Sequence, residues 1–196
     1  MKFVLASKNK KKIEELKKIL SSLMPDCEVL SLTDAGIYDE IEENGTTFEE
    51  NSVIKASAPA KLGYIGVADD SGLCVDALDG APGVYSARYS GGGDQANIDK
   101  LLKELENVPD EKRTAKFVCV MSAVFPDGKT VTARGEAPGV ILRQRRGEDG
   151  FGYDPVFYST DLNKTFAEAT PDEKNKVSHR GRALYAFCEK LKGIIC

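Results

Sequence analysis

Phe117-Val118-Cys119-Val120-Met121 is a continuous apolar run inside the longer segment Thr114 to Phe125, and it decides the fold class. Apolar residues that do not alternate with polar ones are typical of a strand covered on both faces. Pro126-Asp127-Gly128 then predicts a turn into Lys129 to Glu136, which we expect to be an antiparallel partner strand. A sheet covered on both faces needs helices on both sides, and the rest of the chain supplies them.

Strand and helix patterns alternate along the whole chain. Lys2 to Ala6 predicts a first strand, and Asp94 to Leu105 predicts a helix with one apolar face. Two more helices are expected from apolar residues at helical spacing, namely Ile13, Leu16, Leu20 and Leu23 near the start and Ala183, Leu184, Phe187, Cys188 and Leu191 near the end. We therefore predict a single α/β domain, residues 1–196, with a mixed sheet flanked by helices.

Thr47 to Leu62 predicts a further helix with a clear start signal. Thr46 or Thr47 is expected as the N-cap, with an acidic residue in the first turn. Pro59 is expected to kink this helix or to end it early, because proline lacks a backbone N–H.

Composition limits the classes of function. The chain has 196 residues and a net charge of −4, which gives no general attraction to nucleic acid. We expect no signal peptide and no membrane-spanning segment, and the five cysteines are scattered without a C-x-x-C pair. We expect a cytoplasmic protein with reduced thiols, no membrane partner and no stable nucleic-acid partner.

Asp69 and Asp70 follow the apolar run Ile65 to Ala68, which we expect to be a buried strand. Gly72 is expected to turn the backbone sharply, so that the two carboxylates leave the strand end in roughly opposite directions. Carboxylates suit Mg²⁺, which one or two of them hold together with substrate phosphates. Asp-Asp-Ser-Gly is also good turn sequence, so the pair alone does not identify a site.

Ser7-Lys8-Asn9-Lys10-Lys11-Lys12 stands between the first expected strand and helix. Backbone N–H groups and the positive end of a helix dipole favour an anion at such a place, and the side chains add donors and charge. Four lysines oppose the helix dipole, and a bound polyphosphate would relieve that conflict. A solvated basic helix start is the other interpretation.

The C-terminal third holds two more unusual segments. Gly150-Phe151-Gly152-Tyr153-Asp154-Pro155 sets aromatic rings among glycines, where a planar base could stack, although a turn with packed aromatics has the same composition. Lys174, Ser178, His179 and Arg180 stand just before the last expected helix. His179 is the only histidine, and it is either structural or placed to meet an anion or a carbonyl oxygen.

Six segments, in order, resemble those of the inosine/xanthosine triphosphate pyrophosphatase family, which hydrolyses non-standard purine nucleoside triphosphates. The resemblance covers nearly the whole chain, and Pro59 is its one departure. The segments are Ser7-Lys8-Asn9 through Lys12, Glu42 to Asn51 with Lys55, Ala68 to Leu73, Gly80 to Gly91, Phe151 to Pro155, and Ser178-His179-Arg180-Gly181.

The resemblance implies an elongated, two-lobed α/β fold with a nucleotide cleft between the lobes, Mg²⁺ dependence and a homodimer. It implies that Asp70 is the general base and a metal ligand, and that Glu42 or Glu43 completes the metal site. The residues implied in triphosphate binding are Ser7, Lys8, Asn9, Lys10, Lys11, Lys12, Lys55, Ser71 and Lys174. ITP, dITP and XTP would be hydrolysed to the monophosphate and pyrophosphate, which keeps them out of DNA and RNA.

The resemblance also places the base. Phe151, with Gly152 and Tyr153 beside it, lies against the base, Asp154 lies near its edge, and His179 with Arg180 lies near its six position. Arginine can donate to a six-keto oxygen, whereas the six-amino group of adenine would face it donor to donor, so ATP should be rejected. No residue is identified that would exclude GTP at the two position.

Two other functions stay open beside this one. One is a pyrophosphatase of the septum-inhibition type, which acts on modified pyrimidine nucleotides. The other is a nucleotide-binding regulator without turnover, which would have no need of Asp70 beside an acidic partner at Glu42 or Glu43.

Overall fold

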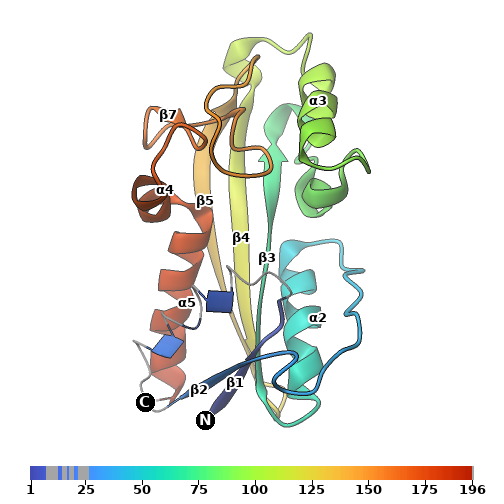
Figure 1. The fold of residues 1–196 in the computed structure, drawn as a ribbon, viewed down its shortest axis with the longest axis vertical. Helices are drawn as coiled ribbons and strands as arrows, with labels where there is room; N and C mark the ends of the chain where they lie inside the picture. Colours follow the sequence, from blue (N-terminus) through green and yellow to red (C-terminus); the bar gives the residue numbers. More distant parts are fainter. Residues whose placement is uncertain (8–12, 15–16, 18–19, 22–26, 196) are drawn as a thin grey trace. The chain divides into compact units, whose positions relative to one another are not determined.

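A seven-stranded sheet with the strand order β2-β1-β3-β4-β5-β6-β7 organises the chain (Figure 1). The structure is a computed structural model and describes residues 1–7, 13–14, 17, 20–21 and 27–195. β1 runs parallel to β2 and β3, whereas β6 is antiparallel to β5 and β7, so the predicted mixed sheet is confirmed. The strands are β1 (Lys2–Leu5), β2 (Glu28–Ser31), β3 (Ile65–Val75), β4 (Thr114–Val124), β5 (Thr130–Ile141), β6 (Phe157–Ser159) and β7 (Lys164–Thr165).

The helices confirm the α/β class. They are α2 (Phe48–Ala60), α3 (Asp94–Glu104), α4 (Pro171–Val177) and α5 (His179–Ile195), with 3₁₀ turns η1 (Asp76–Leu78), η2 (Gly83–Arg88) and η3 (Asp110–Lys112). Of the first expected helix, residues 13–14, 17 and 20–21 are helical, and Leu20 is fully buried. Leu16 and Leu23 lie outside the described residues. In the part of the chain that the structure describes, none of the helices has the length and apolar character needed to cross a membrane.

The chain divides into two compact units, which we describe separately. Unit 1 comprises Met1–Asp70, Val120–Arg134 and Ala183–Cys196, and unit 2 comprises Ser71–Cys119 and Gly135–Arg182. β3, β4, β5 and α5 contribute residues to both units. The expectations of one domain over residues 1–196, of two lobes and of a cleft between them stay predictions.

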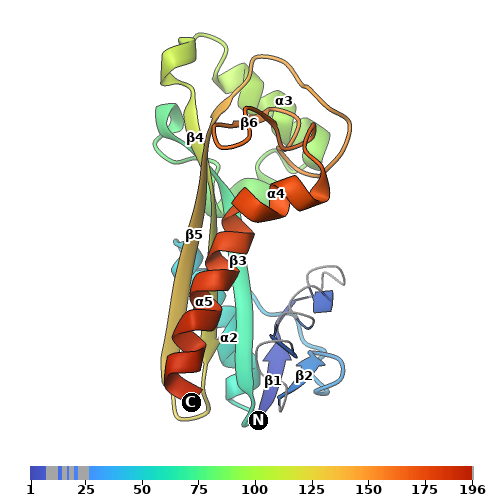
Figure 2. The same cartoon turned by 90° about the vertical axis from the view of Figure 1, so that its left-hand side faces the viewer.

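In unit 1, α2 and α5 lie on opposite faces of the sheet (Figure 1 and Figure 2). The core on the α2 side is built mainly from small residues, which allow helix and sheet to approach closely. Its buried members are Val4, Ala6, Leu32, Ala56, Ala60, Ala68 and Val124.

In unit 2, larger side chains fill the core, including three phenylalanine rings that contact one another. Phe117 lies 4.6 Å from Phe157 and 5.8 Å from Phe166, measured between ring centroids. Arg113 is buried beside this core, and its guanidinium donates to the carbonyl oxygens of Leu105, Ile141 and Leu142. It thereby joins the end of α3 to the end of β5, and each of its three nitrogens donates a hydrogen bond, as suits a buried charge.

β3 corrects one prediction. The sharp turn expected at Gly72 is wrong, because the strand continues from Ile65 to Val75. Leu73 and Val75 are fully buried and pack in the core of unit 2, so burial of apolar side chains keeps the segment extended. Asp70 therefore lies in the middle of a strand and not at its end.

Most other expected elements are present, with shifted ends. Thr47 caps α2 with Glu50 as its capping-box partner, and the helix ends at Ala60, one residue after Pro59. The expected turn joins β4 to β5, and Phe125 donates to the carbonyl of Lys129 across it. Because this connection between β4 and β5 is so short, the two neighbouring strands are antiparallel, as predicted.

The end of the chain differs from the prediction. α4, which was not predicted, holds Lys174, and His179 and Arg180 lie in the first turn of α5 and not before it. Thr170 caps α4 with Glu173, a capping box directly followed by a proline at the helix start.

Gly66 in β3 is where α2 approaches the sheet most closely. A Cβ atom placed on Gly66 would lie 1.8 Å from the carbonyl oxygen of Ala56. We predict that Gly66→Ala lowers the free energy of unfolding by about 3 kcal/mol, because backbone must move away from backbone. Urea unfolding followed by circular dichroism measures this loss.

Gly193 provides the matched control, because a Cβ atom there meets nothing within 4 Å. Gly193→Ala should leave stability unchanged or raise it by about 0.5 kcal/mol, the usual effect of alanine in a helix. Equal stabilities for the two variants would contradict the close approach at Gly66.

Candidate functional site

Asp70 occupies the centre of a polar group in unit 1. Its Oδ1 lies 3.1 Å from Nζ of Lys55, and its Oδ2 accepts a hydrogen bond of 3.2 Å from Nδ2 of Asn51. Adjacent residues of a strand point to opposite faces, so Asp69 projects away from this group, and it is buried. Only one of the two neighbouring carboxylates therefore faces α2.

A second carboxylate joins this group from the loop before α2. Oε2 of Glu43 lies 3.1 Å from Nζ of Lys55, so one ammonium lies within reach of both Glu43 and Asp70. Glu42, the other predicted metal ligand, is exposed, as is Glu43 itself. The structure thus brings Glu43 to Lys55, and Lys55 connects it to Asp70.

Charge is unevenly balanced in this group. Burial raises the pKa of the Asp70 carboxyl, with repulsion from Glu43 in the same direction, and Lys55 and Asn51 offset only part of the shift. Burial lowers the pKa of the Lys55 ammonium, but attraction to Asp70, Glu43 and Asp69 outweighs it, so the net shift is upward. Both shifts favour the protonated form. Burial is the main cause for the pKa of Asp70, whereas the pKa of Lys55 is raised because three carboxylates act on one ammonium, an excess of negative charge.

This excess suits a cation with hard oxygen ligands. Mg²⁺ is usually held by one or two carboxylates, with water and substrate phosphates completing its octahedron. Among the residues that the structure describes, no group of three or more His, Cys, Asp or Glu side chains could hold a metal ion by itself. Asp70 and Glu43, two carboxylates that share one ammonium, have the ligand chemistry that an Mg²⁺ ion bound together with a polyphosphate uses.

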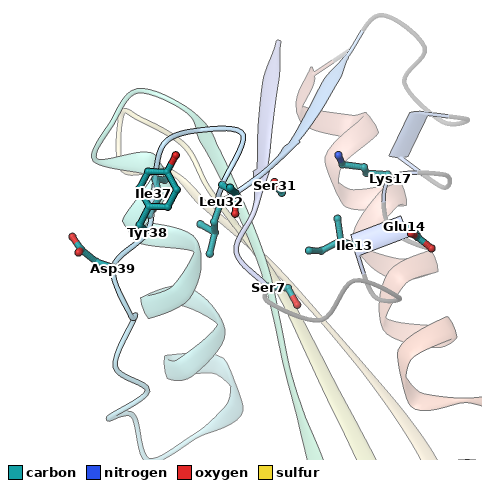
Figure 3. Close-up of a pocket in the computed structure, with 10 residues that line it drawn as sticks. Ser7, Ile13, Glu14, Lys17, Ser31, Leu32, Ile37, Tyr38 and Asp39 are labelled. Carbon is teal, nitrogen blue, oxygen red and sulfur yellow. The ribbon is translucent and has the colours of Figure 1, made fainter.

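The segment between β1 and the first helix is only partly described. Ser7 lines a cavity of about 480 Å³ in unit 1, together with Ile13, Leu32, Ile37 and Tyr38 (Figure 3). The predicted phosphate-binding residues Lys8, Asn9, Lys10, Lys11 and Lys12 lie outside the described residues. Ser71, another predicted phosphate ligand, follows Asp70 in β3 and is half-buried.

The glycine-rich loop of unit 2 presents an aromatic ring to solvent. Phe151 is 65% exposed, and Nζ of Lys174 lies 4.7 Å from the centroid of its ring. Oδ2 of Asp154 accepts hydrogen bonds from the backbone N–H of Phe151, at 2.9 Å, and from Lys174, at 2.5 Å. The ring is therefore supported from within the loop while much of its surface stays open.

Two further contacts fix the same loop. The backbone N–H of Gly152 donates to Oδ2 of Asp94, over 2.8 Å. The hydroxyl of Tyr153 donates to the carbonyl oxygen of Ser86, over 2.9 Å, and burial raises the pKa of this phenol. The loop is thus held before any ligand binds.

His179 and Arg180 start α5 in unit 2. The imidazole of His179 stacks on the ring of Phe117, with centroids 4.9 Å apart and planes 15° from parallel. His179 is buried, and Arg180 is half-buried. The only histidine is thus a packed side chain at a helix start, where its ring orientation is fixed.

Asn51 is the site residue that sequence reasoning missed as an individual contributor. It lies four residues before Lys55 and so on the same face of α2. That spacing was visible in the sequence, but asparagine inside a helix carries no signal of its own before its partners are known.

Comparison with known proteins gives consistent results. The sequence profile of the Ham1 family matches residues 3–190. A relative from Clostridium perfringens named dITP/XTP pyrophosphatase is 50% identical, covering 99% of this chain and 98% of its own length. A relative of the same name from Geobacter sulfurreducens is 53% identical, covering 97% of this chain and 96% of its own length.

Solved structures agree with these relatives. The Ham1 protein of Staphylococcus aureus has a TM-score of 0.91 at 42% identity, over 98% of this chain and 99% of that one. A nucleoside-triphosphatase and dITP/XTP pyrophosphatase from Mycobacterium abscessus has a TM-score of 0.84 at 49% identity, over 95% of this chain and 98% of that one. The resemblance inferred from six sequence segments is confirmed, and this chain belongs to the Ham1 family.

Proposed function

We propose that this chain hydrolyses the non-standard purine nucleoside triphosphates ITP, dITP and XTP to the nucleoside monophosphate and pyrophosphate. The observation that carries the proposal is the polar group in which Lys55 lies within 3.1 Å of both Asp70 and Glu43. The names of the relatives from Clostridium perfringens and Geobacter sulfurreducens supply the substrate class.

Asp70 would act as the general base. A carboxylate at this position can orient a water molecule and accept its proton. The water attacks, and the bond between the α and β phosphates breaks. The electrons of the broken bond leave with pyrophosphate. Lys55 would offset the negative charge that grows on this leaving group.

Asp70 and Glu43 would hold Mg²⁺ together with the substrate phosphates. When bound, Mg²⁺ acidifies water and neutralises phosphate charge, so a carboxylate can serve as the base. Glu42 stays an alternative ligand from the sequence, although Glu43 is the one beside Lys55.

The other predicted phosphate contacts come from the resemblance. We propose that Ser7 and Ser71 contribute hydroxyl donors, together with the residues of the basic segment that lie outside the described part, namely Lys8, Asn9, Lys10, Lys11 and Lys12. Lys174 is a further proposed phosphate contact, and in the structure it contacts Asp154 and the ring of Phe151.

Base selection would depend on unit 2. Phe151 offers an exposed ring for stacking, with Gly152, Tyr153 and Asp154 fixing its loop. Arg180, beside His179, would donate to the six-keto oxygen of hypoxanthine or xanthine. Adenine carries an amino donor at that place, so a buried donor would be left unpaired and ATP would be rejected.

Assembly and location are further expectations from the resemblance. We propose a homodimer in the cytoplasm that keeps deaminated nucleotides out of DNA and RNA. Size-exclusion chromatography with light scattering tests the homodimer directly.

Asp70→Asn tests the general base. Turnover of ITP should fall by about 10³-fold, because an amide cannot accept the proton of the attacking water. Binding of a non-hydrolysable ITP analogue with Mg²⁺, measured by calorimetry, should weaken far less than turnover.

Asp127→Asn is the matched control, because Asp127 is an exposed carboxylate of unit 1 in the turn after β4. It should leave turnover and binding unchanged. Full activity of Asp70→Asn would remove Asp70 as the base, and tight binding of ITP by an inactive wild-type protein would favour the regulator.

Arg180→Ala tests base selection. It should lower kcat/KM for ITP and XTP by about 10²-fold, the usual loss when a charged donor to the substrate is removed, and leave the low activity on ATP nearly unchanged. Steady-state kinetics on each nucleotide measure this difference.

Arg182→Ala is the control for this variant, since Arg182 lies in the same turn of α5 and contacts Asp161. Its kinetics should match the wild type for every nucleotide. An equal loss on ITP, XTP and ATP in Arg180→Ala would place Arg180 on the phosphates and contradict the proposed base contact.

A further inference from the structure

Asn51 connects two segments that both carry acidic residues of the site. It lies on α2 with only 1% of its surface exposed. Its Nδ2 donates to Oδ2 of Asp70 over 3.2 Å, and its Oδ1 accepts from the backbone N–H of Gly45 over 2.8 Å. One neutral side chain thus joins the strand that carries Asp70 to the loop that carries Glu43.

The amide of Asn51 has only one orientation that satisfies both partners. The backbone N–H of Gly45 can only donate, so it must face the amide oxygen. The ionised carboxylate of Asp70 can only accept, so it must face the amide NH₂ group. Turning the amide over would set donor against donor and acceptor against acceptor, which is costly in a buried place.

Lys55 makes the equivalent connection one helical turn later. It lies on the same face of α2 as Asn51 and contacts Oδ1 of Asp70 and Oε2 of Glu43, each over 3.1 Å. The two oxygens of Asp70 are therefore held by two different residues of one helix. The carboxylate cannot rotate without losing one of these interactions.

At Gly45 the loop that carries Glu43 approaches α2 closely. A Cβ atom placed on Gly45 would lie 2.7 Å from Oδ1 of Asn51 and 2.7 Å from Cβ of Glu50. Any larger residue would push the loop away from α2. The loop that carries Glu43 is thus placed against Asn51 by steric fit as well as by a hydrogen bond.

We propose that Asn51 is a positioning residue, which fixes the rotation of the Asp70 carboxylate and keeps the loop of Glu43 beside it. The inference rests on the proposed function, in which Asp70 is the general base. A neutral donor suits this role, because it orients Asp70 without removing the negative charge that attracts a cation. Lys55 also orients Asp70, but it cancels part of that charge.

Asn51→Leu tests the role in turnover. It removes both hydrogen bonds, keeps the branching of the side chain and adds no charge. We expect kcat for ITP to fall about 10- to 100-fold, as is typical when the support of a catalytic group is lost, while KM changes by less than about threefold. This separation of kcat from KM is not expected from a general weakening of the fold.

Ser52→Ala is the matched control on the same helix. Ser52 is fully buried and its hydroxyl lies 2.7 Å from Oγ of Ser122, so its loss weakens the packing of α2 without touching Asp70. It should lower the thermal midpoint and leave kcat unchanged. Unchanged kcat in Asn51→Leu, or an equal loss of kcat in both variants, would overturn the proposal.

A second experiment does not depend on turnover. Asn51→Asp keeps an acceptor for Gly45 but sets a carboxylate against Asp70, so it should lower the unfolding midpoint. Adding Asp70→Asn puts the amide donor at position 70 and leaves the carboxylate acceptor at position 51, so the hydrogen bond can form in the reverse direction. Most of the lost stability should then return, while activity stays absent. No recovery in the double variant would overturn the direct contact, whereas a wild-type protein inactive on ITP would count against the proposed function alone.

Discussion

Helix α2 lies directly against β3, and the site depends on that closeness. Gly66, Ala68 and Asp70 share one face of the strand, because side chains alternate along it. The first two are small, which lets the carbonyl of Ala56 approach Gly66 and brings the neighbouring Lys55 to Asp70. A larger residue at either small position would move the ammonium away from its carboxylate.

The charges of Lys55, Asp70 and Glu43 in this polar group do not stabilise the fold as well as they could. The side chains of Lys55 and Asp70 are each only 13% exposed, and withdrawing such ions from water costs several kcal/mol apiece, which the pair recovers in part. Glu43 adds a further negative charge beside the same ammonium. Proteins retain conflicts of this kind at functional sites, and a bound cation with its polyphosphate would relieve this one.

The sequence predicted the α/β class, the start of α2 and the mixed sheet, because apolar periodicity and capping residues are local signals. It failed where distant contacts decide the structure. Gly72 is ordinary turn sequence, yet burial of Leu73 in the core of unit 2 keeps β3 extended. The contact of Lys174 with Asp154 was not predicted and became visible only in the structure. Asn51 gave no signal, because its partner Asp70 lies 19 residues away in the sequence.

The central claim is that this acidic group, fixed on α2 and β3, directs water to the bond between the α and β phosphates. Phosphorus NMR of a reaction with ITP and Mg²⁺ tests it most directly, because it identifies every product at once. We expect IMP and pyrophosphate in equal amounts, no orthophosphate, and no reaction once the metal is chelated. IDP with orthophosphate would contradict the claim, because the bond broken would then be the one between the β and γ phosphates.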